Sequence, residues 1–445
     1  MIAPKSPRID PSRVADRLRE RIGADRVELQ RGEPLTVGGE AGYVLATPHS
    51  QEELAETLRC ASDEAWRVIP SGAGTWLEMG NQPAPFDLIL STRRLNRLLE
   101  YEPADLTATL EAGLSLAAFN QIAGGHRQWI PLDPFGDSAG TIGATIATAS
   151  AGPLRCGYGT PRDWLIGIRV ARIDGRLVRA GGKVVKNVAG YDLAKLYTGS
   201  LGSLGVITET TFKLRSLPPA EATVAFYASH PAPLIGVVER FRSAFIEPAA
   251  LELLSPAQST TLPLDATSYC LIVRFLHEPE AVTSQIASAA ELAPGIDHTQ
   301  LSPTEASAFW NGYAESETAP GLSRSWRLTM LPSDLLTVVE EVERRLPGIR
   351  WRAHAASGIV RLFWPRAGDA LWDIPDWPAE QIAEGPALRD WIQARGGELV
   401  QLRPTGGDYF DTWGSPRSGL PLMRALKTTF DPDSLLNPGR FVGGL

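Results

Sequence analysis

The sequence contains few of the residues that disulfide frameworks and metal centres require. Only 3 of its 445 residues are cysteine (Cys60, Cys156 and Cys270), and they are far apart and odd in number. Such cysteines are typical of free thiols in a reducing compartment, which favours a cytoplasmic location. The 6 histidines show no spacing typical of metal ligands, so no metal site is expected. They are His49, His126, His230, His277, His298 and His354.

Positive charge and long apolar runs are also scarce. The chain has 43 Lys and Arg against 51 Asp and Glu, a formal net charge of -8. It offers no basic field for a phosphate backbone, so nucleic acid is not expected as a partner. No run of about 18 apolar residues occurs, and the charged N-terminal stretch lacks the apolar core of a signal peptide. Any membrane association is expected to come through a partner.

Glycine and proline, in contrast, are plentiful and spread along the chain, with 42 and 35 residues. They indicate many tight turns and sites lined by backbone. The length favours two or three domains. The Pro-rich stretch 216–220 separates a Gly-rich first half from alternating strand and helix patterns. We therefore predict an α+β protein whose parts are residues 1–218, 219–403 and 404–445.

Local patterns predict the regular elements. Asp10 and Pro11 predict the start of one helix, and Ser50 with Glu53 predicts a capping box at the start of another. Asp174-Gly175 predicts a hairpin. Further strands are predicted at 66–70, 86–91, 106–111, 204–214, 222–227, 250–254, 269–275, 325–330, 350–355, 359–363 and 398–403. Further helices are predicted at 115–123, 233–245, 279–292, 333–346, 386–395 and 420–430.

A first Gly-rich loop, Ser71-Gly-Ala-Gly-Thr75, follows a predicted strand. Two glycines one residue apart allow positive φ and consecutive inward N–H groups, which can form a nest for an anion such as pyrophosphate. A Rossmann fingerprint is disfavoured because the chain after Gly74 breaks instead of starting a helix, and no Gly-Lys-Ser/Thr of a P-loop occurs. The alternative is an ordinary tight turn.

Two more clusters of small residues follow. Pro131 to Gly159 has little helix or strand pattern and is predicted as a functional loop, whose bare backbone and hydroxyl groups suit a flat, extended ligand. The alternative for 141–149 is a helix packed through small residues. In the third cluster, glycine recurs at 199, 202 and 205 before a strand. Lys183 and Lys186 lie upstream. They could pair with a negative charge on a ligand, or be solvated surface residues.

Together, the three loops in this order resemble the PCMH-type FAD-binding flavoproteins, the vanillyl-alcohol-oxidase-like family. Within it, GGKVVKNVAGYDLAKLYTGSLGSLGVITE is similar to FAD-binding E subunits of glycolate oxidases. The tail FDPDSLLNPGRF and the segment GLSRSWRLTMLPSD are similar to other signatures of that group. The resemblance implies a PCMH-type fold of two α+β subdomains with its core at about 37–218. It also implies an α+β cap domain on an antiparallel sheet and a C-terminal segment that returns to the FAD.

The resemblance also assigns residues to the cofactor. Many relatives bind FAD covalently through a His in the first loop, and this chain has none there, which implies non-covalent FAD. The implied pyrophosphate contacts are Pro70, Ser71, Gly72, Ala73, Gly74 and Thr75. The implied ribityl and ring contacts are Pro131, Asp137, Ser138, Thr141, Ile142, Gly143, Thr145, Ala151 and Gly152. Gly205 and Ile207 are implied on the adenine side, and Asn437 is implied to return the tail to the flavin.

The catalytic residues are less defined. Hydroxy-acid-oxidising relatives carry a His-rich metal motif, whose counterpart here, residues 352–358, has a single His. His354 is a candidate for a lone base that removes the hydroxyl proton, or a hydrogen-bonded structural residue. Arg352 and Arg361 could bind a substrate carboxylate through their guanidinium forks, or form ion pairs.

The function implied by the resemblance is oxidation of glycolate or a related 2-hydroxy acid in a complex. The resemblance also implies the partners, a homologous FAD-containing catalytic subunit and an iron–sulfur subunit. The three scattered cysteines agree with this, since they cannot hold a four-Cys cluster. Two alternatives remain. One is a non-catalytic assembly subunit that keeps the FAD fold, and the other is a stand-alone FAD-dependent oxidoreductase of another hydroxy acid or alcohol.

Overall fold

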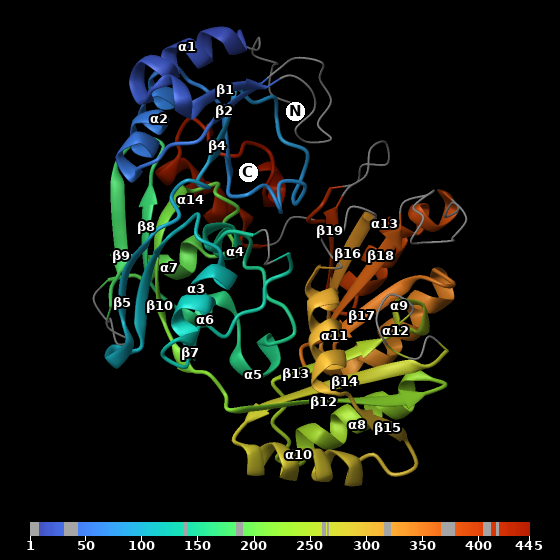
Figure 1. The fold of residues 1–445 in the computed structure, drawn as a ribbon. Helices are drawn as coiled ribbons and strands as arrows, with labels where there is room; N and C mark the ends of the chain where they lie inside the picture. Colours follow the sequence, from blue (N-terminus) through green and yellow to red (C-terminus); the bar gives the residue numbers. More distant parts are fainter. Residues whose placement is uncertain are drawn as a thin grey trace.

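A computed structural model describes residues 9–30, 43–136, 140–183, 190–259, 264, 267–315, 322–365, 379–403, 411–414 and 418–445. These residues form two lobes (Figure 1). The first lobe holds the described residues from Ile9 to about Ser216 together with the C-terminal tail. The second lobe holds the residues from Ala220 to Arg403.

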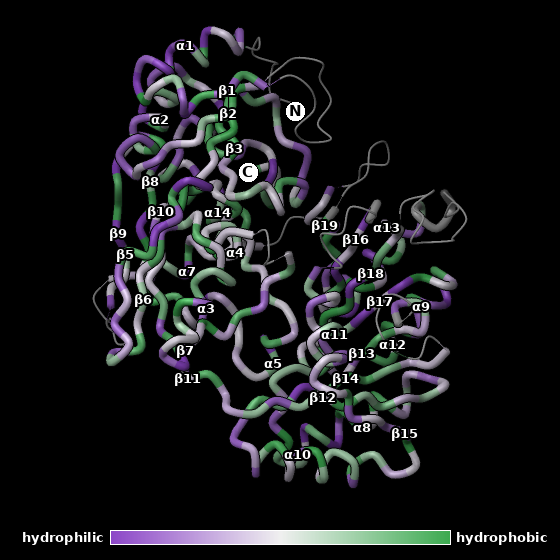
Figure 2. The backbone as a smooth tube through the Cα atoms, in the orientation of Figure 1, coloured by the Kyte–Doolittle hydropathy of each residue, from purple (hydrophilic) through white to green (hydrophobic). Residues whose placement is uncertain are grey.

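A small mixed sheet begins the first lobe. Its order is β1 (Val27–Gln30), β2 (Tyr43–Ala46), β4 (Leu88–Ser91), β3 (Val68–Ser71), with β4 parallel to both neighbours. Helices α1 (Pro11–Ile22) and α2 (Gln51–Asp63) pack on it with their apolar residues, and their outer turns are largely hydrophilic (Figure 2). One short 3-10 helix, Ala24–Arg26, follows α1.

The predicted helix caps are confirmed. The N–H of Ser12 donates to Asp10 Oδ1 at 2.9 Å, and the N–H of Glu53 donates to Ser50 Oγ at 3.1 Å. The return bond differs from the prediction, because Glu53 accepts from the N–H of His49 at 2.7 Å and not from that of Ser50. The return bond of this capping box therefore comes from the N–H of the residue before the N-cap.

A five-stranded antiparallel sheet forms the rest of the first lobe. Its order is β5 (Leu98–Glu102), β6 (Thr107–Glu111), β10 (Val206–Lys213), β8 (Leu165–Ala171), β9 (Leu177–Gly181). The predicted hairpin between β8 and β9 is confirmed, and Gly175 in its turn has φ +77°. The helices beside this sheet are α3 (Leu116–Gly124), α4 (Ile142–Thr148), α6 (Pro161–Trp164) and α7 (Leu193–Tyr197). The first lobe also contains a two-stranded ladder, formed by β7 (Gln128–Trp129) and β11 (Arg215–Ser216). A 3-10 helix, Pro103–Asp105, lies between β5 and β6 in the sequence.

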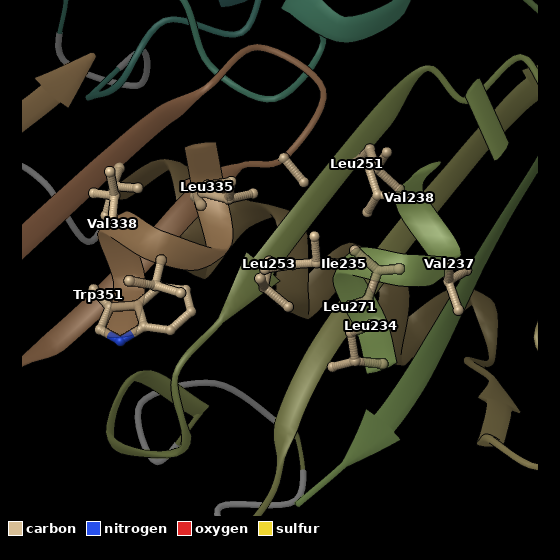
Figure 3. Packing of buried hydrophobic residues seen from close by; sticks show 14 of the residues in the cluster. Leu234, Ile235, Val237, Val238, Leu251, Leu253, Leu271, Leu335, Val338 and Trp351 are labelled. Carbon is tan, nitrogen blue, oxygen red and sulfur yellow. The ribbon is translucent and has the colours of Figure 1, made fainter. Parts of the chain in front are cut away.

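An eight-stranded antiparallel sheet forms the second lobe. Its order is β15 (Asp297–Gln300), β12 (Ala220–Ala228), β14 (Tyr269–His277), β13 (Ala250–Leu254), β17 (Arg350–His354), β18 (Ile359–Pro365), β16 (Leu322–Thr329), β19 (Glu398–Arg403). Its outer face is covered by α8 (Pro231–Ser243), α10 (Pro279–Glu291), α12 (Leu335–Arg345) and α13 (Ala379–Gln393). Figure 3 shows Ile235 of α8 beside Leu253 and Val338 of α12 beside Trp351, all members of one buried cluster. The short helices α9 (Pro256–Ser259) and Pro332–Asp334 lie at its strand ends.

The other face of this sheet looks toward the first lobe and is polar at its centre. Helix α11 (Pro303–Glu315) covers part of it with Phe309, Trp310 and Tyr313. Along β17, Arg350, Arg352 and His354 alternate with residues of the outer core, so their side chains stand on this inner face. All three are buried.

The tail returns to the first lobe after α14 (Leu420–Phe430) and ends with the 3-10 helix Val442–Gly444. The N–H of Val68 donates to Leu435 O at 2.8 Å, and the N–H of Asn437 donates to Val68 O at 2.8 Å. The tail thus lies beside β3 like a further short strand.

Two expectations of the sequence need correction. The segment 131–159, predicted as a loop, contains α4, which confirms the alternative of a helix packed through small residues at 141–149. It also contains α5 (Arg155–Tyr158), which was not predicted. Helix α11 and strand β15 were not predicted. Among the described residues, no helix is both long enough and apolar enough to cross a bilayer.

Candidate functional site

A pocket lies in the first lobe where three loops and the tail meet. The loop after β3, the helix α4, the loop before β10 and the tail each form part of its wall. Its described lining is Pro70, Ser71, Gly72, Gly74, Thr75, Trp76, Leu77, Met79, Thr92, Gly143, Ala144, Ala147, Thr148, Leu201, Gly202, Gly205, Val206, Ile207, Asn437 and Arg440.

The first loop presents bare backbone to this pocket. Ser91 Oγ donates to Gly72 O at 2.9 Å, and the N–H of Thr92 donates to Ser71 O at 2.9 Å, which fixes the carbonyl groups away from the loop's N–H groups. Within the described residues, the N–H groups of 72–75 have no acceptor. Gly74 has φ +94°, the left-handed conformation that such a turn requires. The loop can therefore donate several hydrogen bonds to an anion.

Helix α4 forms the second wall and packs closely through its small residues. A Cβ added to Gly143 would lie 2.7 Å from Ala112 Cβ, and one added to Gly72 would lie 2.0 Å from Thr141 Oγ1. Both distances are far below van der Waals contact, so side chains at these glycines would force the wall apart. Because Gly72 and Gly143 have no Cβ, the first loop and helix α4 can lie this close to their neighbours, and this close packing defines the pocket wall.

The third loop is held against the C-terminal turn of α4. The N–H of Gly199 donates to Ile146 O at 2.9 Å, and the N–H of Leu201 donates to Ala147 O at 2.8 Å. At Gly205, which has φ +159°, an added Cβ would lie 2.5 Å from Val170 Cγ1. The loop before β10 therefore fits its place only with glycine there.

The tail contributes two buried side chains. Asn437 is 4% exposed, and its Nδ2 donates to Leu201 O. Its Oδ1 lines the pocket without a hydrogen-bond partner among the described residues. Arg440 is also 4% exposed and donates to the carbonyl groups of Leu77 and Met79. A buried amide oxygen left unpaired is costly, so Asn437 indicates a missing donor in this pocket.

The residues that the sequence assigned to a cofactor fall into three groups. Those that line the pocket are Pro70, Ser71, Gly72, Gly74, Thr75, Gly143, Gly205, Ile207 and Asn437. Those beside it or elsewhere are Ala73, Pro131, Thr141, Ile142, Thr145, Ala151 and Gly152. Among these, Ile142 is a core residue, and Gly152 packs on Asp133, where a Cβ would lie 2.1 Å from Asp133 O. Asp137 and Ser138 lie outside the described residues, as does Lys186.

Lys183 lies away from this pocket. Its Nζ pairs with Glu100, whose strand, β5, is at the edge of the five-stranded sheet. Lys183 is therefore not among the residues that line the pocket.

A buried polar cluster lies on the inner face of the large sheet. His354 Nδ1 lies 2.6 Å from Glu252 Oε1, and Tyr313 donates its hydroxyl hydrogen to the other oxygen of Glu252. Glu252 is 0% exposed and His354 3%. Burial raises the pKa of Glu252 to about 8, against the opposing effects of Tyr313 and of nearby arginines. Burial also raises the pKa of Tyr313 well above its usual range.

The two candidate arginines meet at this cluster. Arg352 and Arg361 are cross-strand partners on β17 and β18, and their guanidinium carbons lie 4.7 and 4.2 Å from the ring centre of Phe135. The Arg352 guanidinium also stacks on Tyr313 at 3.9 Å and donates to Tyr313 O at 2.9 Å. Phe135 belongs to the second predicted loop of the first lobe, so the arginines face that lobe.

Sequence reasoning missed Glu252, Tyr313 and Phe135. A signal for Glu252 exists, because it is the only charged residue in the apolar strand Ala-Leu-Glu-Leu-Leu. Its partners come from distant strands and could not be inferred from that pattern.

The described part of the chain shows neither a cluster of metal ligands nor a disulfide. It contains no group of three His, Cys, Asp or Glu side chains placed to hold a metal ion. The three cysteines are unpaired by disulfides, and burial raises the pKa of Cys156 to about 12. A thiol of this kind is not a nucleophile near neutral pH.

Comparison with known proteins adds the family. A model described as an FAD binding domain matches residues 43–181. The chain is 33% identical over 435 residues to the mitochondrial D-lactate dehydrogenase [cytochrome] of Arabidopsis thaliana, with 90% of this chain and 73% of that protein covered. It is 28% identical to glycolate oxidase subunit GlcD of Bacillus subtilis (89% and 88% covered). It is 27% identical to glycolate oxidase subunit GlcE of Escherichia coli (89% and 98% covered).

Solved structures share the fold. An alkyldihydroxyacetonephosphate synthase superposes with a TM-score of 0.72 at 18% identity, covering 98% of this chain and 87% of that one. p-Cresol methylhydroxylase superposes with a TM-score of 0.71 at 14% identity, covering 96% of each chain. The α+β fold with a large antiparallel sheet in a second lobe is therefore that of the PCMH-type flavoproteins, as predicted.

Proposed function

Because this chain belongs to the PCMH-type, FAD-dependent oxidoreductases of 2-hydroxy acids, we propose that it is the FAD-binding subunit of a complex that oxidises glycolate or a related 2-hydroxy acid to the 2-oxo acid. The proposal rests on its similarity to GlcE, whose length it spans to 98%. Its partners are a homologous FAD-containing catalytic subunit and an iron–sulfur subunit that carries electrons onward. The complex is cytoplasmic, and any membrane association is made through the partners.

The pocket in the first lobe has groups that suit FAD. The N–H groups of 72–75 would donate to the pyrophosphate, and Asn437 Oδ1 would accept a hydrogen bond from the cofactor. The described lining contains no His or Cys, which supports the proposal that FAD is held non-covalently. When bound, FAD accepts the hydride from the substrate carbon.

The inner face of the large sheet supplies groups for a 2-hydroxy acid. The guanidinium groups of Arg352 and Arg361 would bind its carboxylate, for which their forks are matched. His354 would take the hydroxyl proton. Because Nδ1 is engaged by Glu252 at 2.6 Å, the proton would be taken by the other ring nitrogen, Nε2. Glu252 would hold the imidazole ring in place, and Tyr313 would hold Glu252.

A second candidate function is favoured by the burial of these groups. Arg352 is 1% exposed, His354 3% and Arg361 5%. An assembly subunit that keeps the FAD fold and leaves oxidation to its sister subunit has no need for an open substrate site. A stand-alone enzyme acting on another hydroxy acid or alcohol is the remaining alternative.

One experiment separates the three functions. The purified chain, loaded with FAD, is mixed anaerobically with glycolate, D-lactate or D-2-hydroxyglutarate while the flavin absorbance is followed. Bleaching by glycolate supports an active site in this chain, and an unreactive yellow protein supports the assembly role. Affinity purification from native cells then tests the complex, and the absence of flavoprotein and iron–sulfur partners would support a stand-alone enzyme.

A further inference from the structure

A single buried ammonium group connects two walls of the pocket in the first lobe. Lys427 lies on α14, does not line the pocket, and is 3% exposed. Its Nζ donates to Ser203 O at 2.8 Å and to Leu436 O at 2.7 Å. Ser203 belongs to the third loop, next to the lining residue Gly202, and Leu436 precedes the lining residue Asn437.

Asp431 completes this connection four residues along the chain. Its Oδ2 accepts from Lys427 Nζ at 2.5 Å. Its two carboxylate oxygens also accept from the N–H groups of Leu435 and Leu436, at 3.0 and 2.8 Å. Asp431 is 0% exposed, so the ion pair is removed from water. Burial lowers the pKa of Lys427, and the neighbouring carboxylate opposes that effect.

We propose that Lys427, with Asp431, is a positioning residue for FAD: it fixes the third loop and the tail relative to each other so that both fit the cofactor. This inference rests on the proposed function, because it assumes that FAD occupies the pocket. One acceptor from the third loop and two from the tail meet one ammonium group, and the tail in turn is bonded to β3 through Val68. The first loop begins where β3 ends, so Lys427 adds to the Asn437–Leu201 hydrogen bond in joining the third loop to the tail, and the tail joins the first loop through β3.

The inference predicts that FAD affinity and stability respond differently to substitution. Lys427→Met leaves Asp431 buried without its cation, which lowers the melting temperature of the apo protein. It also releases Ser203 O and Leu436 O, so we expect the Kd for FAD to rise at least about tenfold. In Lys427→Met/Asp431→Asn the lone buried charge is gone, so the melting temperature recovers while the Kd stays raised.

Val14→Ala is the matched control. Val14 is a 0% exposed core residue of α1 in the same lobe and does not line the pocket. Its truncation lowers the melting temperature of the apo protein without releasing either loop carbonyl. We expect its Kd for FAD to remain within about threefold of wild type.

The experiment uses full-length, deflavinated protein. FAD binding is titrated by the quenching of FAD fluorescence, melting is followed for the apo protein, and amide hydrogen exchange is measured at 199–205 and 435–437. Faster exchange at both segments in Lys427→Met, with the raised Kd, supports the proposal. A Kd for Lys427→Met that matches Val14→Ala, or a Kd that recovers with melting temperature in the double variant, overturns it. Wild-type protein that takes up no FAD overturns the proposed function itself.

Discussion

Nδ1 of His354 lies 2.6 Å from Oε1 of Glu252, in a part of the large sheet where both residues are almost fully buried. The two side chains come from neighbouring strands, paired across β13 and β17, although they are 102 residues apart in the sequence. Because one hydrogen lies between them, their protonation states depend on each other. When Glu252 is protonated, its O–H donates a hydrogen bond to Nδ1. The ring hydrogen of the neutral imidazole is then on Nε2. With Glu252 ionised, Nδ1 carries the proton and Nε2 can act as a base.

The first prediction is a pH-dependent rate of flavin reduction. The pKa of Glu252 is raised to about 8 by burial, so the form with a basic Nε2 grows as the pH rises through that value. In stopped-flow mixing of the FAD-loaded protein with its 2-hydroxy acid, we expect the rate to rise and level off above about pH 8. A flat profile between pH 6 and 9 would exclude this pair as the base.

Glu252→Gln extends that test. A glutamine amide can donate to Nδ1 and hold His354 in the tautomer whose Nε2 carries a hydrogen, so the rate should fall by about 10²-fold or more and lose its step near pH 8. Unchanged FAD absorbance and melting would show that the pocket in the first lobe is intact. A variant that reduces flavin as fast as wild type would limit Glu252 to a structural role.

The second prediction concerns stability. A carboxyl group whose folded pKa exceeds its unfolded value, here about 8 against 4.5, keeps a proton that the unfolded chain releases. Its contribution to stability is fully present below about pH 4.5 and is lost as the pH rises to about 8. The free energy of unfolding should therefore fall by up to about 1.4 kcal/mol per pH unit over that range from this group alone.

Urea unfolding of wild type and Glu252→Gln at several pH values between 5 and 8 measures this slope. The slope should be smaller in the variant. Glu341→Gln is the control, because arginine neighbours lower the pKa of Glu341 to about 2, and its contribution is lost only as the pH falls below about 4.5. Equal slopes for wild type and Glu252→Gln would show that the carboxyl group is ionised throughout this pH range.

Much of the fold was predictable where the signal is local. Side-chain caps at Asp10 and Ser50 and the Asp174-Gly175 turn involve residues within a few positions of each other, and each is present. Strand β15 was missed because all four of its residues are exposed, which leaves no apolar alternation. Helix α11 has apolar residues at 306, 309, 310 and 313, a helical spacing that would have predicted it.

The candidate site was predictable only in part. The Gly-rich loops are visible in the sequence, but their meeting in one pocket depends on contacts such as Gly199 N–H with Ile146 O and Asn437 Nδ2 with Leu201 O, which join distant segments. The same holds for Glu252, whose partner His354 follows from strand order and register. Sequence periodicity tells which face a residue occupies but not which strand lies beside it.

The third prediction tests carboxylate binding by Arg361. Arg361→Lys keeps the charge but removes the planar fork and its stacking on Phe135 at 4.2 Å. For the 2-hydroxy acid we expect KM to rise about 10-fold or more, with a smaller change in kcat, because the lost contact binds substrate and transition state alike. Arg424→Lys, at an exposed position of α14, is the control and should leave both constants unchanged. A fall in kcat alone would place Arg361 outside the carboxylate site.

The fourth prediction tests the contact between the first loop and α4. In Gly72→Ala the new methyl group would lie 2.0 Å from Thr141 Oγ1, so loop and helix must separate. We expect a loss of about 1–3 kcal/mol in the free energy of unfolding and a clear rise in the Kd for FAD. Gly124→Ala is the matched control, since nothing lies within 4 Å of its added methyl and alanine favours the helix. Adding Thr141→Ala to Gly72→Ala removes Oγ1 and should restore part of the FAD affinity. A Gly72→Ala protein that binds FAD like wild type would mean that the loop can move away from α4 without disturbing the cofactor pocket.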